Sequence, residues 1–199
     1  MPSNKAVVTV ALLAAVAGAA ASLYFEPTIA LKLARTPVGQ KALALRGAAV
    51  QVPDGVPVAR RGDAVPAMTL KTPEGTDVPL PDAWAGKPTL VNLWATWCAP
   101  CLKEMPELDA YAAEQGANGV QVTGIALDDA AAVQAFLTQH GIGYPNLVDA
   151  PGPTDAGVRL GNPAGVLPYT VLVSADGRLL KSRIGPFIDQ ADIAAWATP

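Results

Sequence analysis

Both cysteines of this 199-residue chain lie in one eight-residue stretch, WATWCAPC, which spans residues 94–101. The segment that leads into it, KPTLVNLWAT, is a nearly continuous apolar run, typical of a β-strand buried on both faces. The residues that follow, APCLKEMPELDAYAAEQG, carry apolar side chains at helical spacing. The sequence therefore predicts a buried strand that leads directly into a helix, with Cys98 and Cys101 at the junction.

This junction favours a reactive cysteine pair. Two residues three apart in a helical turn lie close enough for a disulfide, whose Cα atoms must be about 4.4 to 6.8 Å apart. Pro100 suits the first turn, where its missing N–H has no helical partner. Unpaired N–H groups and the helix dipole stabilise a thiolate there, so we expect the pKa of Cys98 to lie below the free value of about 8.5. Cys98 is then predicted to attack a partner disulfide, and the shielded Cys101 to resolve the adduct.

Three other roles for the pair are weaker. A static disulfide across so short a loop constrains little of the unfolded chain. A structural zinc site usually needs four ligands, whereas the chain has one histidine, His140, and no third cysteine. A peroxidatic site needs a means of positioning peroxide, which a CxxC pair does not supply. Thiol–disulfide exchange without a metal or other cofactor is therefore the predicted chemistry.

Charge is distributed unevenly along the chain. Residues 1–52 hold five Lys/Arg and one Asp/Glu, whereas residues 53–199 hold nine and sixteen. The acidic body has no basic stripe to neutralise phosphates, which argues against a nucleic-acid partner. Because 51% of the residues are hydrophobic, the chain has ample apolar surface for the core of one domain.

A charge-free run of twenty residues, 6–25, follows the N-terminal MPSNK. As a helix rising about 1.5 Å per residue, it would just cross a hydrocarbon core about 30 Å thick. Small-residue triplets such as Ala17-Gly18-Ala19 also look like signal-peptidase sites. We expect either a membrane anchor or a cleaved signal peptide, both of which would export the rest of the chain; a buried soluble helix is the third alternative. Positive charges on both sides leave the orientation of the run open.

Residues 26–62 contain four prolines and no alternation long enough for a sheet, so we interpret them as a linker. The linker is expected to be partly helical around residues 28–34 and 40–45, where Lys and Arg could rest on a lipid surface. A fully solvated linker is the alternative. The body of the protein is expected to begin near Asp63.

Strand and helix patterns alternate through the body. AMTLKT and DVPL flank Gly75 as a predicted hairpin, VQVTGIAL is a second buried strand, and AAAVQAFLTQHG is a helix closed by Gly141. YPNLVD is a short strand, PYTVLVSADGRLLKSRIG a hairpin turning at Asp176-Gly177, and the final helix covers residues 189–196. This order predicts an α/β fold, a mixed sheet with helices on both faces.

Several motifs together resemble the thioredoxin superfamily, and within it the TlpA/ResA-like group of membrane-tethered extracytoplasmic thiol:disulfide oxidoreductases. These motifs are WATWCAPC, the proline at position 106, YPNLVD, the Leu167-Pro168 step and ADGRLLKSRIGP. The resemblance covers roughly residues 63–199, and the CxPC centre followed by KEMPEL is its most specific part. It implies a thioredoxin-like fold, a redox-active disulfide and export to the periplasm, with a tether to the inner membrane.

Two features concern partner docking. Pro168 resembles the cis-proline that faces the cysteine pair in this superfamily, where the cis step presents the Leu167 backbone to an extended substrate strand. An ordinary trans proline that opens an edge strand is the alternative. Trp97 is expected to form an apolar lip beside Cys98, and Trp94 to belong to the core.

The proton-handling acid is not at its usual place. Thioredoxin has a buried aspartate six residues before the first cysteine; here that position is Asn92, which cannot take a proton from the resolving thiol. The resemblance points first to Asp128, at the end of the VQVTGIAL strand, and also to Glu104, which matches the family's ExP glutamate. The alternatives are a helix cap for Asp128 and a solvated first-turn acid for Glu104.

We therefore expect an exported oxidoreductase that reduces disulfides in client proteins, for example apocytochrome c or copper-site proteins. The resemblance implies that a membrane electron donor of the DsbD/CcdA kind recharges it. A dithiol oxidase or isomerase of the same fold is one alternative, and a non-catalytic metal carrier that uses the two thiolates is another. The reduction potential distinguishes a reductase from an oxidase or isomerase, and the metal content of the purified protein identifies a metal carrier.

Overall fold

The computed structural model describes residue 18 and residues 36–48, 50–116 and 119–198. The chain divides into two compact units, residues 1–42 and residues 43–199. α3 (Pro37–Ala48) crosses this division, and the elements from β1 onward lie in the second unit.

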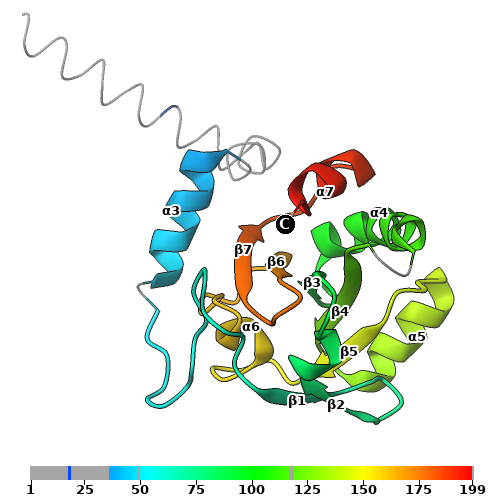
Figure 1. The fold of residues 1–199 in the computed structure, drawn as a ribbon, viewed down its shortest axis with the longest axis horizontal. Helices are drawn as coiled ribbons and strands as arrows, with labels where there is room; N and C mark the ends of the chain where they lie inside the picture. Colours follow the sequence, from blue (N-terminus) through cyan, green and yellow to red (C-terminus); the bar gives the residue numbers. More distant parts are fainter. Residues whose placement is uncertain (1–17, 19–35, 49, 117–118, 199) are drawn as a thin grey trace, which may run out of the picture. The chain divides into compact units, whose positions relative to one another are not determined.

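The second unit is built on a seven-stranded mixed sheet with the strand order β2-β1-β5-β4-β3-β6-β7 (Figure 1). Three strands run parallel at its centre, β3 (Thr89–Trp94), β4 (Gln121–Leu127) and β5 (Asn146–Asp149). Antiparallel hairpins extend both sides: β6 (Tyr169–Val173) with β7 (Leu179–Ile184), and β1 (Met68–Lys71) with β2 (Asp77–Leu80). β3, the strand that leads to the cysteines, is thus enclosed by β4 and β6, which explains its largely apolar sequence.

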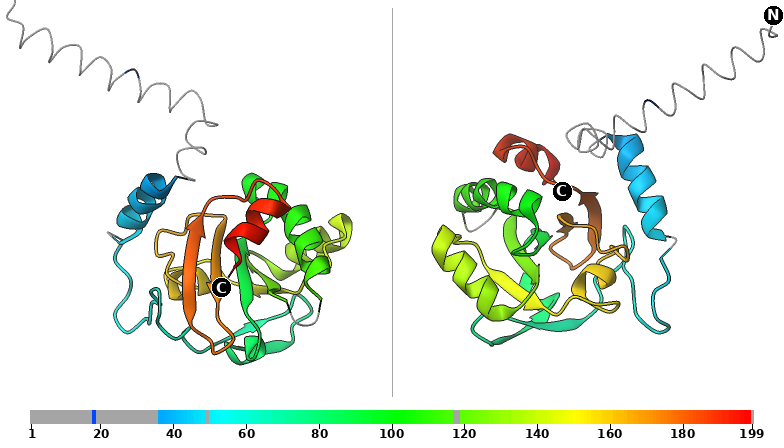
Figure 2. Two further views of the ribbon diagram at one scale, coloured as in Figure 1. Left: turned by 45° about the horizontal axis from the view of Figure 1, so that its top comes forward. Right: turned by 180° about the vertical axis from the view of Figure 1, so that it is seen from behind.

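Helices cover the two faces of the sheet unequally. Leu90 and Trp94 of β3 pack on the face covered by α4 (Ala99–Gln115), α5 (Ala130–His140) and α7 (Gln190–Trp196). α7 lies beside α4 (Figure 2). Val91 and Leu93 pack on the other face, against the short helix α6 (Ala156–Arg159) and the turn η1 (Asp82–Trp84). Because successive side chains of a strand point to opposite faces, the single apolar strand contributes to both cores.

A buried hydrogen bond joins the side chains of β3 and β5 across β4. Trp94 Nε1 donates to Asn146 Oδ1 at 2.9 Å, and Asn146 Nδ2 donates to Tyr144 O at 2.9 Å. The bond passes over Gly124 of β4, where a Cβ atom would lie 1.9 Å from Asn146 Oδ1 and 3.0 Å from Trp94 Nε1. The strand therefore needs glycine at this position, and the assignment of Trp94 to the core is confirmed.

The predicted order of strands and helices in the body is confirmed. α5 ends at Gly141, which adopts the left-handed conformation with φ of 63°, as expected of a glycine at a helix end. Two short elements were not predicted, η1 and the four-residue α6. Neither is long enough to show a periodic pattern in the sequence.

The N-terminal predictions are only partly covered by the described residues. α3 includes the expected helical stretch at 40–45, whereas the stretch at 28–34 and, apart from Gly18, the charge-free run 6–25 lie outside the described residues. Among the residues that the structure describes, no helix is long and apolar enough to span a membrane. Ala59, four residues before the expected start of the body, already packs against it: Ala59 is buried and donates its N–H to Arg159 O at 2.8 Å.

Candidate active site

Cys98 and Cys101 lie where β3 passes into α4, and they form a disulfide with a Cα–Cα distance of 5.3 Å. Cys98 is the N-cap of α4, and its carbonyl accepts from Cys101 N at 2.9 Å and from Leu102 N at 3.1 Å. Cys98 is 5% exposed and Cys101 is 0% exposed, so Cys98 is the more accessible residue of the pair. The helix N-terminus and the difference in burial both favour Cys98 as the attacking thiolate.

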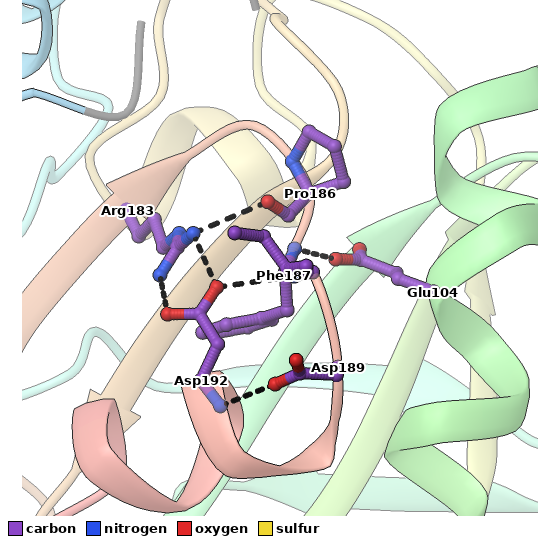
Figure 3. Close-up of polar contacts among 7 residues, drawn as sticks. Glu104, Arg183, Pro186, Phe187, Asp189 and Asp192 are labelled. Carbon is purple, nitrogen blue, oxygen red and sulfur yellow. Dashed lines mark hydrogen bonds and ion pairs between the residues drawn. The ribbon is translucent and has the colours of Figure 1, made fainter. Parts of the chain in front are cut away.

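Glu104 is a buried carboxyl group one turn after Cys101 on α4. Its Oε1 accepts from Asn92 Nδ2 at 2.9 Å, and its Oε2 accepts from the backbone N–H of Phe187 at 2.7 Å (Figure 3). Asn92 Nδ2 also donates to Thr170 Oγ1 at 3.1 Å. The alternative of a solvated first-turn acid is wrong, because Glu104 is 1% exposed.

Local geometry explains why Glu104 meets Asn92. Asn92 lies two residues from both Leu90 and Trp94 on β3, so its side chain points to the same face of the sheet as theirs, the face that α4 covers. The spacing of three residues places Glu104 on the same side of the helix as Cys101. The residue in the position of thioredoxin's buried acid is thus not an acid itself but binds one. A buried carboxyl group is tolerated here because both of its oxygens accept hydrogen bonds.

Tyr144 adds a second buried ionisable group to this environment. Burial raises the pKa of its hydroxyl well above the usual value, and the negative charges of Glu104 and Asp109 raise it further. Tyr144 therefore stays protonated at neutral pH.

Asp128 follows β4 directly and binds the loop that precedes Cys98. Its Oδ2 accepts from Thr96 N at 3.0 Å and from Thr96 Oγ1 at 2.5 Å, and its Oδ1 accepts from Asp129 N at 2.8 Å. Burial by itself raises the pKa of Asp128, but the hydrogen bonds from Thr96 and from the Asp129 N–H together hold the pKa below its usual value. The helix-cap alternative for Asp128 is wrong, because Asp129 caps α5. Asp128 is therefore an ionised carboxylate that holds the Thr96 loop in place.

Trp97 and Leu167 line one cavity beside the cysteines' loop. Trp97 is 67% exposed, and the cavity, of about 310 Å³, is also lined by Leu127, Val158 and Pro163. The Leu167-Pro168 peptide bond is cis, so the trans alternative is wrong. The structure thus brings together the tryptophan and the proline step that the sequence suggested separately.

A larger cavity, of about 860 Å³, lies elsewhere. It is lined by residues at the amino ends of the central strands, such as Gln121 and Asn146, and by residues of α5, and none of the predicted site residues borders it. Within the described part of the chain, no group of three or more His, Cys, Asp or Glu side chains could hold a metal ion.

Residues 60–196 match the family model described as Redoxin. The chain belongs to the Redoxin family. Its redoxin domain is 34% identical over 142 residues to the thiol:disulfide interchange protein HelX of Rhodobacter capsulatus, a match that covers 69% of this chain and 75% of HelX. It is 28% identical over 136 residues to the thiol-disulfide oxidoreductase ResA of Halalkalibacterium halodurans, covering 67% of this chain and 73% of ResA.

The fold of the redoxin domain is similar to that of solved structures. A secreted thiol-disulfide isomerase from Corynebacterium glutamicum matches with a TM-score of 0.59 and 26% identity, over 74% of this chain and 93% of that one. The redoxin domain is thus a thioredoxin-like α/β domain, and the protein is a TlpA/ResA-like thiol:disulfide oxidoreductase with a CxxC pair. The predicted thioredoxin-like α/β fold of the body and the enzyme class are confirmed, whereas the predicted N-terminal signal or anchor segment lies, apart from Gly18, outside the described residues.

Sequence reasoning missed the partners of Glu104. The sequence holds a signal for Asn92, because it is a polar residue inside the apolar strand TLVNLW, but the pattern shows only that an acid is absent there and not that a carboxyl group binds to it. The sequence holds no such signal for the Phe187 N–H, because every residue except proline has a backbone N–H and the residue type does not show what it binds. Its contact with Glu104 joins residues 83 apart in the redoxin domain.

Proposed function

We propose that the protein is an extracytoplasmic thiol:disulfide reductase that opens disulfides in client proteins with the Cys98–Cys101 dithiol. The observation that carries the proposal is the unequal burial of the pair beside an internal acid: Cys98 is 5% exposed, Cys101 is 0% exposed and Glu104 is 1% exposed. An accessible nucleophile, a shielded resolving thiol and a nearby carboxyl group are what a two-step exchange requires.

The exchange proceeds through a mixed disulfide. The Cys98 thiolate attacks one sulfur of the client disulfide, forms a bond to it and releases the other client sulfur as a thiolate. Cys101 then loses its proton, and its thiolate attacks the Cys98 sulfur, which closes the intramolecular disulfide and releases the second client thiolate. The client takes up two electrons and two protons, while the cysteine pair is oxidised.

Glu104 is the group we assign to accept the Cys101 proton. It lies one turn along the same helix as Cys101 and on the same side of that helix, and its carboxyl group is buried in the protein interior like the resolving thiol. Asp128 is the weaker candidate, because Thr96 already engages its carboxylate and its lowered pKa disfavours proton uptake. The proton-handling role that the sequence suggested first for Asp128 therefore moves to Glu104.

Client proteins are proposed to dock along the cavity lined by Trp97 and Leu167, where the backbone beside Pro168 pairs with an extended client segment. The similarity to HelX and ResA supports proteins with thiols or disulfides as clients. Apocytochrome c and copper-site proteins are the clients we suggest, and a membrane protein of the DsbD/CcdA kind is the suggested source of electrons.

The redoxin domain is further proposed to act in the periplasm, tethered to the inner membrane by residues 6–25 through the linker 26–62. The charge-free run and the proline-containing segment after it support this arrangement. Fractionation tests it: a tethered protein requires detergent for release, and N-terminal sequencing of the mature protein distinguishes an anchor from a cleaved leader.

Trapping of the mixed disulfide tests the exchange mechanism. Cys101→Ala should accumulate client proteins bound through Cys98 and released by reductant. Cys98→Ala, the matched control, should trap none. Failure of Cys101→Ala to trap any protein, or equal trapping by both variants, would contradict the assignment of Cys98 as the nucleophile.

A dithiol oxidase or isomerase is the second candidate, favoured by the similarity to the secreted isomerase of Corynebacterium glutamicum. A redox titration separates the two functions. A midpoint near about −270 mV, the value of thioredoxin, supports reduction, whereas a midpoint near about −120 mV, the value of DsbA, contradicts it.

A further inference from the structure

An ion pair outside the candidate active site holds the loop that supplies the Phe187 N–H to Glu104. The loop, residues 185–189, joins β7 to α7 and forms neither helix nor strand. Arg183 on β7 binds Asp192 on α7 with both ends of its guanidinium, at 3.0 Å from Nη1 to Oδ1 and 2.8 Å from Nη2 to Oδ2 (Figure 3). The two side chains are 11% and 26% exposed, so the bidentate pair is partly shielded from water.

The same pair also binds the backbone on both sides of Phe187. Arg183 Nη2 donates to Pro186 O at 3.2 Å, and Asp192 Oδ2 accepts from Ile188 N at 3.1 Å. The guanidinium carbon lies 4.3 Å from the centroid of the Phe187 ring. The position of the loop backbone therefore depends on this pair.

One peptide group connects Arg183 to Glu104. The Pro186 carbonyl, which accepts from Arg183, and the Phe187 N–H, which donates to Glu104 Oε2 at 2.7 Å, belong to the same peptide unit. A cation at the carbonyl end and a carboxylate at the N–H end polarise this unit in the same direction, and hydrogen bonds in such a chain strengthen one another. The other donor, Asn92 Nδ2, comes from the central strand β3 and does not depend on the loop.

We propose that Arg183 and Asp192 are positioning residues for thiol–disulfide exchange: by fixing the Pro186–Phe187 peptide, they set how readily Glu104 takes up the Cys101 proton. The inference rests on the role of Glu104 proposed above. A hydrogen bond to the charged form of a carboxyl group favours that form. A loosened loop therefore shifts Glu104 toward its protonated form and slows the second step of exchange.

Other ionisable groups lie on the elements that meet at Glu104. Tyr144, which precedes β5, interacts with its charge and remains protonated because burial raises the pKa of Tyr144. Glu107, on α4 itself, accepts from Gln190 N at 3.2 Å, and Asp189 accepts from Asp192 N at 2.8 Å at the start of α7. Unlike these groups, the Arg183–Asp192 pair holds the peptide whose N–H Glu104 accepts. Removal of the pair is therefore expected to change the protonation of Glu104.

The titration of Glu104 in Arg183→Met tests the inference directly. Carbon-13 NMR of labelled glutamate carboxyl groups in the reduced full-length protein follows this titration, and the Glu104→Gln spectrum identifies the signal among the five glutamates of the chain. We expect the midpoint of Glu104 to rise by about one pH unit, as for the loss of one charge-assisted hydrogen bond.

Two further variants complete this titration. Arg178→Met, which removes an exposed arginine paired with Asp176 at 3.3 Å in the same hairpin, is the matched control and should leave the midpoint unchanged. Asp192→Asn preserves the shape of the side chain and guards against loss of folding; it should shift the midpoint in the same direction by a smaller amount.

The rate of resolution supplies a second measurement. A preformed mixed disulfide on Cys98 should be resolved about tenfold more slowly in Arg183→Met than in wild type at a pH well below both midpoints, in line with the same change of about one unit. In the Glu104→Gln background, Arg183→Met should have no additional effect, because the carboxyl group that it acts on is absent.

Two results would overturn the inference: an unchanged Glu104 midpoint in both Arg183→Met and Asp192→Asn, or an equal slowing by Arg183→Met in the Glu104→Gln background. Failure of the wild-type protein to resolve a mixed disulfide would instead refute the proposed function. The NMR midpoint would still report whether the loop controls Glu104, so the two failures are distinguishable.

Discussion

Replacement of Gly124 by alanine should break the buried hydrogen bond between Trp94 and Asn146. A Cβ atom at this position would lie 1.9 Å from Asn146 Oδ1 and 2.7 Å from Asn146 Cγ, so the amide has to move. The backbone of β4 has little freedom to retreat, because Gly124 pairs with Asn92 on one side and with Asn146 on the other. The variant should therefore lose stability while the disulfide site itself is unaltered in sequence.

The expected size of the loss follows from two contributions. Trp94 is 0% exposed, so leaving its Nε1–H without an acceptor costs about 1–3 kcal/mol. Inserting a methyl group into a packed core costs another ~1–3 kcal/mol. The free energy of unfolding should thus fall by about 2–6 kcal/mol, and the Tm by about 5–20 °C for a domain of this size.

Chemical and thermal unfolding followed by circular dichroism measure this loss. Gly152→Ala is the matched control, because a Cβ atom at Gly152 meets nothing within 4 Å, and its stability should stay within about 1 kcal/mol of wild type. In a double variant with Trp94→Phe, the two losses should be less than additive, since both remove the same hydrogen bond. Stability of Gly124→Ala within about 0.5 kcal/mol of the control would refute this account of the strand.

Three further variants test other parts of the site. Trp97→Ala should raise the KM for a peptide disulfide about tenfold with little change in stability, because the ring is 67% exposed and lines the docking cavity; an unchanged KM would remove Trp97 from the docking site. Asp128→Asn should be less stable than wild type at pH 7, because the fold lowers the pKa of Asp128. This difference should be constant above the ordinary carboxyl value of about 3.9 and shrink as the pH falls below it, and a pH-independent difference in unfolding curves would contradict the argument. Tyr144→Phe should cost less than about 0.5 kcal/mol, because the buried hydroxyl has no hydrogen-bond partner among the described residues; a loss above about 1 kcal/mol in denaturation would contradict that.

Local patterns in the sequence were sufficient to predict the order of elements and the cysteine site. The apolar run of β3, the helical spacing of α4 and the CxPC spacing each depend on residues close together in the chain. The surroundings of Glu104 could not be predicted in this way. Its burial depends on Asn92, 12 residues before it, and on Phe187, 83 residues after it. Asp128 shows the converse: its position was predicted, but its partner Thr96 lies on another loop, 32 residues away.

Arg183 and Asp192 had the appearance of ordinary surface charges in the sequence. They lie in different elements, and only the turn between β7 and α7 brings them to 2.8 Å. A position on a strand or helix is a local property, whereas the partner of a charged side chain is a property of the complete fold. This difference explains why the chemistry of the cysteines could be inferred from the sequence and the control of the neighbouring acid could not.

The ends of the sheet have a consequence for how the protein meets unfolded chains. β2 and β7 are the edge strands, and an exposed edge can recruit foreign strands and start aggregation. β2 contains Asp77 and Pro79, and β7 contains Lys181 and Arg183; proline cannot donate to a neighbouring strand, and charged side chains resist such pairing. Both edges of the sheet are thereby protected against pairing with strands of other chains. If clients dock as proposed above, the backbone beside Pro168 is the place where a client segment pairs with the protein.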